Sequence, residues 1–175
     1  MHPRTKELLT HFDANRAFLK SAFDAIPLER RNLPPEPGRW SPAAVVEHLA
    51  PVAGRMAGIL SERIREERAA GLASETSAEP ILHTLDVSRI SDRTTRVQAP
   101  EFAVPTGLDA ETAWSQLEHA TAALRAMLLS GDGLALDNVI HPHSRLGPMS
   151  VYHWIAFLAA HEARHTAQIR EMSAS

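Results

Sequence analysis

The chain has 175 residues, a formal charge of -3 and no cysteine, and these features exclude several classes of protein. Without cysteine there is no disulfide, thiolate metal site or cysteine nucleophile, and we expect a reducing compartment. The 18 basic and 21 acidic residues form no long block of one sign, so neither nucleic acid nor a membrane is an expected partner. We find no signal peptide and no apolar run near the ~20 residues of a membrane span, and we expect one cytoplasmic domain covering residues 1–175.

Apolar residues at helical spacing predict a first helix that ends near Pro27 and a second that begins at Ser41. Ser41 is a favourable N-cap, and Pro42 is a favourable first residue because the amide at that position has no acceptor within a helix. Pro51 lies inside the second helix, where it removes one backbone hydrogen bond. We therefore expect a bend next to His48.

The helical pattern breaks into short pieces over residues 71–108, where the stretch around Ile81 fits either a short helix or a strand. A connection of this length is either functional or locally ordered. Asp109 then caps a third helix that Gly131 ends, and Ser150 caps a fourth helix. The sequence therefore predicts an all-α four-helix bundle with a long loop between helices two and three.

The ten histidines are the unusual feature of the composition, and two of them lie at metal-ligand spacing. His161 and His165 are four residues apart and continue the apolar stripe of Trp154 and Leu158, so both imidazoles face the core. Two adjacent unpaired imidazoles are costly to bury, and together they can bind one ion. A catalytic site usually has a third protein ligand, and His48 on the inward stripe of helix two is the expected one. Taken alone, His48 also fits a hydrogen-bonded core residue.

Glu162 completes a His-Glu-x-x-His string, in which the glutamate of metalloproteases is a general base. Those enzymes need a third ligand well downstream, and only ten residues follow His165, so we exclude that class. Glu162 can reach a bound water or face solvent. His141 and His143 precede helix four and can either reach the mouth of the site or form a plain turn. His153 lies about 80° off the ligand face, where packing or a substrate pocket is expected.

Three stretches of the chain read Trp40-Ser41-Pro42, Glu47-His48-Leu49 and, at residues 161–169, His-Glu-x-x-His-x-x-Gln-Ile. With shorter matches between residues 92 and 148, they resemble the DinB-like (DinB/YfiT) superfamily over nearly the whole chain. The resemblance implies a four-helix bundle of up-down-down-up topology and a homodimer. It also implies a site for zinc, nickel or a similar ion, with His48, His161 and His165 as the ligands.

The superfamily includes thiol S-transferases, a thiol-dependent isomerase and many proteins labelled as metal-dependent hydrolases. We therefore predict a metal-dependent transferase or hydrolase, in which the ion activates water or a low-molecular-weight thiol toward a small-molecule substrate. The alternative is a non-enzymatic stress-response or binding bundle with a structural or vestigial metal site. A fourth protein ligand, for example His141, would favour that alternative.

Overall fold

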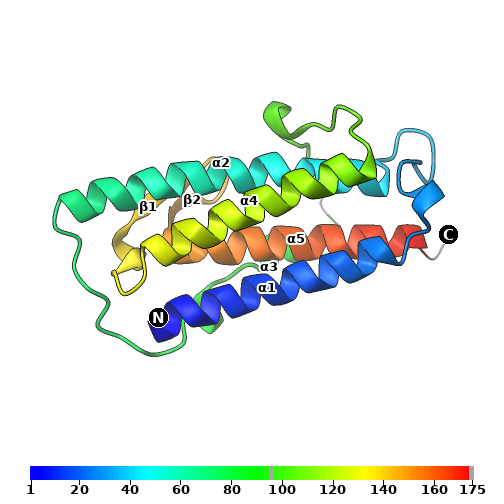
Figure 1. Cartoon of the computed structure of the whole chain (residues 1–175). Helices are drawn as coiled ribbons and strands as arrows, with labels where there is room; N and C mark the ends of the chain where they lie inside the picture. Colours follow the sequence, from blue (N-terminus) through cyan, green and yellow to red (C-terminus); the bar gives the residue numbers. More distant parts are fainter. Residues whose placement is uncertain (95–96, 174–175) are drawn as a thin grey trace.

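The computed structural model describes residues 1–94 and 97–173, and four long helices dominate this part of the chain (Figure 1). They are α1 Pro3–Asp24, α2 Pro42–Ala69, α4 Ala110–Ser130 and α5 Val151–Ser173. Figure 1 shows α1 and α5 running in one direction and α2 and α4 in the other, which is the up-down-down-up order. Helix α2 packs along α4, and α1 packs along α5. The predicted four-helix bundle is confirmed.

The long connection between α2 and α4 follows from this topology. Two neighbouring parallel helices cannot be joined by a short turn, because the chain must first return to the starting end of the bundle. The 28 residues of α2 correspond to a return path of about 42 Å at 1.5 Å per residue. Among its described residues, the return has three short helical pieces: η2 Leu82–Thr84, α3 Ser88–Ser91 and η3 Glu101–Ala103. Near Ile81 the short helix is therefore observed, and the strand is not.

The predicted ends of the helices are confirmed by their caps. The Ser41 hydroxyl oxygen accepts a hydrogen bond of 3.1 Å from the Ala44 amide at the start of α2. The Asp109 carboxylate caps α4 in the same way, and Gly131 is the C-cap of that helix. Helix α2 continues without interruption through Pro51, so the missing hydrogen bond does not divide it.

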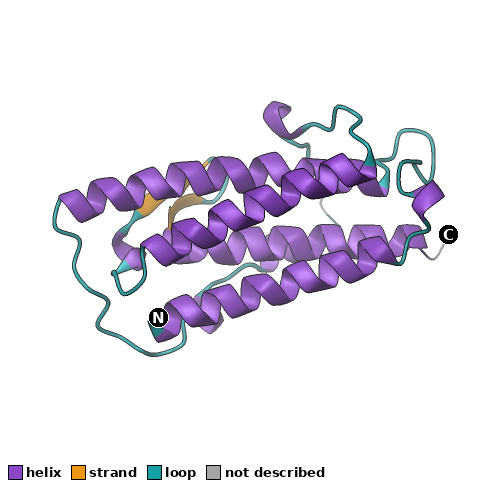
Figure 2. Cartoon of the chain, in the orientation of Figure 1, coloured by secondary structure: helices purple, strands orange, loops and turns teal. Residues whose placement is uncertain are grey.

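A two-stranded antiparallel hairpin, β1 Ile140–His143 and β2 Gly147–Ser150, precedes α5 and adds a small β element to the predicted all-α fold (Figure 2). The positive φ of Gly147, 79°, lets the chain turn into the second strand. Ser150 ends that strand and also caps α5, since its hydroxyl oxygen accepts a 3.3 Å bond from the His153 amide.

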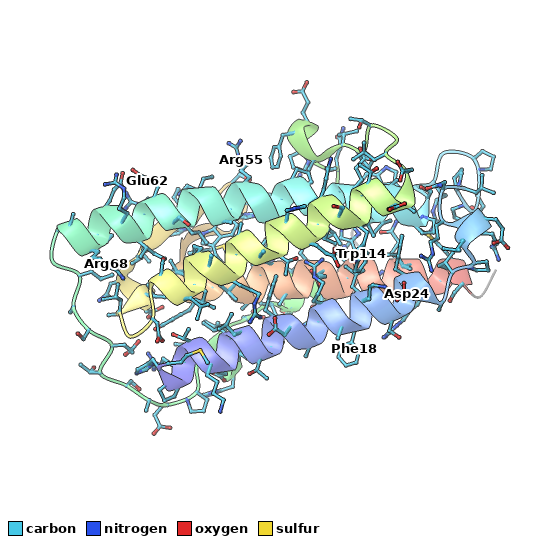
Figure 3. The ribbon with its side chains drawn as sticks, in the orientation of Figure 1. Phe18, Asp24, Arg55, Glu62, Arg68 and Trp114 are labelled. Carbon is cyan, nitrogen blue, oxygen red and sulfur yellow. The ribbon has the colours of Figure 1, made fainter. Side chains whose placement is uncertain are left out.

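Buried apolar side chains form two clusters in the bundle, and the histidines lie where the clusters meet. In α5 the first cluster extends to Ala159 and the second includes Ile169, so residues 161 and 165 fall between them. In α2 the change from one cluster to the other comes after Ala50, two residues beyond His48. On the opposite, outward face of α2 the side chains are open to solvent, as the exposed Arg55 in Figure 3 shows.

Helix α2 is also long and apolar enough, by length and composition, to cross a membrane, and it is the one such helix in the described part of the chain. This differs from the expectation that no segment approaches that length. However, 61% of its most apolar window is buried inside the bundle. Its apolar residues are therefore those of a core helix that packs on α4.

Candidate metal centre

His48 of α2 and His161 and His165 of α5 bring their Nε2 atoms together. The Nε2 atom of His161 lies 3.4 Å from that of His48 and 3.2 Å from that of His165. All three candidate ligand atoms lie within 4.8 Å of one another. Over residues 1–94 and 97–173, this is the one group of three or more histidine or carboxylate side chains with such spacing. The fold thus assembles the three residues that the sequence predicts as ligands.

The two Nε2–Nε2 distances from His161 fit the donor geometry of a tetrahedral ion. With zinc–nitrogen bonds of 2.0–2.1 Å and tetrahedral angles, two ligand nitrogens lie about 3.3 Å apart. The distances of 3.4 Å and 3.2 Å from His161 lie on either side of that value. Imidazole is a suitable ligand for zinc, nickel and copper. Three protein ligands leave one position of a four-coordinate ion for water or substrate.

Hydrogen bonds on the far side of two of the rings determine which nitrogen can bind metal. Nδ1 of His48 lies 2.8 Å from the Ala103 carbonyl oxygen, and a carbonyl can only accept. Nδ1 of His48 therefore carries the proton, and Nε2 keeps its lone pair. Nδ1 of His165 donates in the same way to Oε1 of Gln168 at 2.9 Å. Metal-binding histidines usually have such an acceptor on the second nitrogen.

The surroundings keep all three imidazoles in the neutral form that binds metal. Burial lowers the pKa of His48 below its usual value. Burial and the neighbouring His165 hold the pKa of His161 well below that value, and burial with the nearby His48 lowers the pKa of His165 to about 4. At neutral pH such a cluster can accept a dication without first releasing protons.

Aromatic rings border the histidine cluster on two sides. The Trp40 ring lies 5.0 Å from the ring of His48 and 6.4 Å from that of His165, measured between centroids. The Phe157 ring stacks on His161 at a centroid distance of 5.9 Å and an interplanar angle of 6°. Apolar surroundings of this kind limit the access of solvent to a metal site and lower its local dielectric.

The other candidate histidines near α5 lie outside the ligand group. His143 packs its ring on Phe157 at a centroid distance of 4.9 Å. The backbone carbonyl of His141 accepts a hydrogen bond from the Trp154 indole, and His153 bonds to the cap residue of its own helix. In the part of the chain that the structure describes, none of these three belongs to the group with metal-ligand spacing. His143 therefore borders the site through Phe157, whereas His141 contacts Trp154, which is one ring farther from the candidate ligands.

Glu162 is directed toward α1. Its Oε2 atom lies 2.7 Å from Nη2 of Arg16, and 5% of the Glu162 side chain and 14% of the Arg16 side chain are exposed. Burial raises the pKa of Glu162 to about 7, against the lowering effect of the Arg16 charge. The glutamate of the His-Glu-x-x-His string thus packs between α1 and α5 and is not a candidate metal ligand.

Sequence patterns do not reveal the contacts of two neighbouring residues, Ala103 beside the His48 ring and Glu47 with the loop that follows Ala103. Ala103 acts through its backbone carbonyl, which no side-chain pattern reports. Glu47 is a charged residue on the buried face of α2, and that placement is the one signal that could have identified it. Burial raises the pKa of Glu47, but hydrogen bonds from the Thr106 hydroxyl and from loop amides outweigh it and hold that pKa below its usual value.

Comparisons with known proteins agree with this fold. The sequence profile of the DinB superfamily matches residues 11–169. The uncharacterized protein YuaE of Bacillus subtilis (strain 168) is 25% identical over 146 residues, which cover 82% of this chain and 83% of YuaE. Among solved structures, the crystal structure of TT2238, a four-helix bundle protein, matches with a TM-score of 0.61 and 20% identity. That match covers 95% of this chain and 98% of the other, and at this identity it shows the fold alone.

Proposed function

The chain belongs to the DinB superfamily, and from this premise we propose that it is a metal-dependent enzyme whose ion, zinc or nickel, is held by His48, His161 and His165. The observation that carries the proposal is the convergence of three histidine nitrogens within 4.8 Å of one another, with two of the Nε2–Nε2 distances close to those around a tetrahedral ion. When bound, such an ion supplies Lewis acidity and lowers the pKa of water or a thiol at its remaining position. The proposed reaction is transfer of a low-molecular-weight thiol, or hydrolysis, at an electrophilic centre of a small molecule.

The residues of the chain have distinct tasks in this proposal. The Ala103 carbonyl and the Gln168 side chain orient two of the ligand rings by holding Nδ1. Trp40 and Phe157 limit the water around the ligands. Because all the ligands are neutral, the charge of a divalent ion is not compensated by the protein, which favours an anionic nucleophile over a neutral one.

The alternative is a bundle with a structural metal site and no catalytic activity. A structural zinc site normally has four protein ligands. The group found among the described residues has three, so the enzyme is the favoured proposal.

Metal analysis tests the proposal first. Protein purified without added metal, stripped with a chelator and dialysed against zinc or nickel should retain about one ion per chain. His48→Ala and His165→Ala should lose it. His119→Ala is a matched control, because His119 is an exposed histidine of α4 that bonds only to the Ser115 carbonyl of its own helix among the described contacts. Metal content near zero after incubation, or equal content in all variants, would remove the basis of the proposal.

Activity is tested separately. The metal-loaded protein is screened with common cellular thiols and a model electrophile, each with and without chelator. Consumption of the electrophile that the chelator abolishes, and that His165→Ala lacks, supports the enzyme. A tightly bound ion with no chelator-sensitive turnover of any substrate supports the structural alternative.

A further inference from the structure

Glu47 immediately precedes His48 on α2, and its side chain is buried, with 6% of its surface exposed. The carboxylate accepts four hydrogen bonds. Oε1 accepts from the amide of Thr106 at 2.6 Å and from its hydroxyl at 2.7 Å. Oε2 accepts from the amides of Gly107 at 3.1 Å and Leu108 at 3.0 Å. All four donors belong to one loop segment, so this carboxylate attaches residues 106–108 to α2.

The backbone of the segment is shaped for this contact. Gly107 has a φ of 99°, in the left-handed region that a residue with a side chain rarely adopts. Successive amides in such a turn form a concave site for an anion. Here the anion is the Glu47 carboxylate, so the loop has one defined position on the helix.

The carbonyl that contacts His48 lies in the same loop, just before residues 106–108. Ala103 is the last residue of η3, three positions before Thr106, and it is 1% exposed. Its carbonyl oxygen lies 2.8 Å from Nδ1 of His48. Two consecutive residues of α2 therefore hold one loop, His48 at Ala103 and Glu47 at residues 106–108. If the loop moves, the acceptor of the His48 ring moves with it.

We propose that Glu47 is a positioning residue of the metal centre: by holding residues 106–108 it fixes the Ala103 carbonyl, and thereby the tautomer and orientation of His48. This inference rests on the proposed function insofar as it concerns metal affinity. Its structural part, the link from Glu47 to the His48 ring, concerns the metal-free protein as well.

The test compares the parent protein with Glu47→Gln and Thr106→Val. Glutamine keeps the size of the side chain but replaces one acceptor oxygen by an NH₂ group, which cannot accept from the loop amides. Valine removes only the hydroxyl donor and leaves the amides in place. If Glu47→Gln does not fold, Thr106→Val still tests the same contact with a smaller expected effect.

Two measurements report on the His48 ring. In metal-free protein at neutral pH, ¹⁵N NMR of the imidazole rings distinguishes the two tautomers. We expect the parent to have the proton of His48 on Nδ1 and Glu47→Gln to show a mixture. In metal-loaded protein, competition with a chromophoric chelator gives the zinc affinity, and the visible spectrum of the cobalt-substituted protein reports coordination geometry. We expect Glu47→Gln to bind zinc about tenfold more weakly and to have an altered cobalt spectrum, since outer partners of metal ligands have effects of this size.

Glu75→Gln is the matched control. Glu75 is also a largely buried carboxylate, with 7% of its side chain exposed, and it also fastens a loop, through hydrogen bonds from Arg4, Ser77 and Tyr152. It follows the C-terminal end of α2, whereas His48 is near the N-terminal end. Glu75→Gln should lower the thermal stability and leave the His48 tautomer, the zinc affinity and the cobalt spectrum unchanged.

The outcomes separate the two proposals. A Glu47→Gln protein with the parent tautomer, affinity and spectrum would overturn the positioning role. The role would also be overturned if Glu75→Gln changed these three quantities equally, because general loosening would then be the cause. A parent protein that binds neither zinc nor cobalt would contradict the proposed function, while the tautomer measurement would still decide the link between Glu47 and His48.

Discussion

His161 and Glu162 are neighbours in the chain, yet they belong to two buried polar regions with opposite character. Glu162 meets the guanidinium of Arg16 at 2.7 Å, so negative and positive charge balance within the protein. His161 meets His48 and His165, and this group contains no carboxylate. The first region places an acid opposite a base, although Nε and Nη1 of Arg16 and Oε1 of Glu162 have no hydrogen-bond partner among the described residues. In the second region the Nε2 atoms of three imidazoles converge, and one added cation could bind all three. We therefore interpret the buried pair of opposite charges as structural and the converging neutral donors as a candidate cation site.

Arg16→Met should have the largest effect, because it leaves the Glu162 carboxylate buried without its partner. Since the pKa of Glu162 is already about 7, its carboxyl can take up a proton in the variant, and we expect the free energy of unfolding of the metal-free protein to fall by about 3 kcal/mol, measured by urea denaturation. The double variant Arg16→Met/Glu162→Leu should recover most of this loss, and zinc content should stay at the parent level in both. A single variant as stable as the parent would show that this ion pair is not a structural unit.

Zinc should stabilise the histidine region by a somewhat smaller amount. At free zinc 100-fold above the dissociation constant, the folded protein gains about 2.7 kcal/mol, which appears as a rise in melting temperature. His48→Ala and His165→Ala should show little or no rise. An equal rise in melting temperature in the parent and in both variants would mean that zinc binds elsewhere. The histidine group would then not differ from the ion pair as a site for a cation.

The ion pair of Glu75 with Arg4 is a second largely buried pair of opposite charges, so it can be compared with the pair of Glu162 and Arg16. Burial raises the pKa of Glu75, but hydrogen bonds from Ser77, Tyr152 and Arg4 outweigh it and lower that pKa below its usual value. We expect Glu75→Gln to lower the free energy of unfolding by on the order of 1–2 kcal/mol at pH 7.

The pH dependence of this contribution has a definite sign. Since the folded-state pKa of Glu75 is lowered, the contribution is present above the unfolded-state pKa of about 4.3 and is lost as the pH falls through the folded-state value. Urea denaturation should therefore show the parent and Glu75→Gln converging in stability as the pH is lowered below about 4. A difference that stays constant across this range would mean that the carboxylate charge is not what matters.

His143→Ala should have the smallest effect. His143 contacts the aromatic border at Phe157 but lies outside the ligand group of the described residues. We expect zinc content equal to that of the parent and a change in unfolding free energy within about 1 kcal/mol. Loss of zinc from this variant would show that His143 also helps to hold the ion.

Much of the bundle could be predicted because its signals are local. Ser41 and Asp109 cap helices through contacts with the next two or three residues, and such contacts follow from residue type and spacing. The pairing of His161 with His165 is equally local, since one helical turn sets it. His48 could be predicted as the third candidate ligand because the apolar residues around it indicate that it lies on the buried face of its helix.

The features that could not be predicted from the sequence depend on contacts between segments that are far apart in the chain. The β1–β2 hairpin has strands of four residues, too short for a clear alternation of apolar and polar side chains. The direction of Glu162 is set by Arg16, which is far away in sequence on another helix. The contacts of His48 with Ala103 and of Glu47 with Thr106 span more than fifty residues, and no local pattern records them.

The parallel arrangement of α2 and α4 requires a long connection between them, and that connection brings the Ala103 carbonyl to the ring of His48 (Figure 1). Lengthening a loop that must exist anyway is inexpensive, about 0.6 kcal/mol for each doubling of its length. The helices thus form a fixed frame, and the return segment is the part where insertions can change the surroundings of the three histidines. Under the proposed function, substitutions meant to alter substrate preference belong in this segment, with the four helices left as they are.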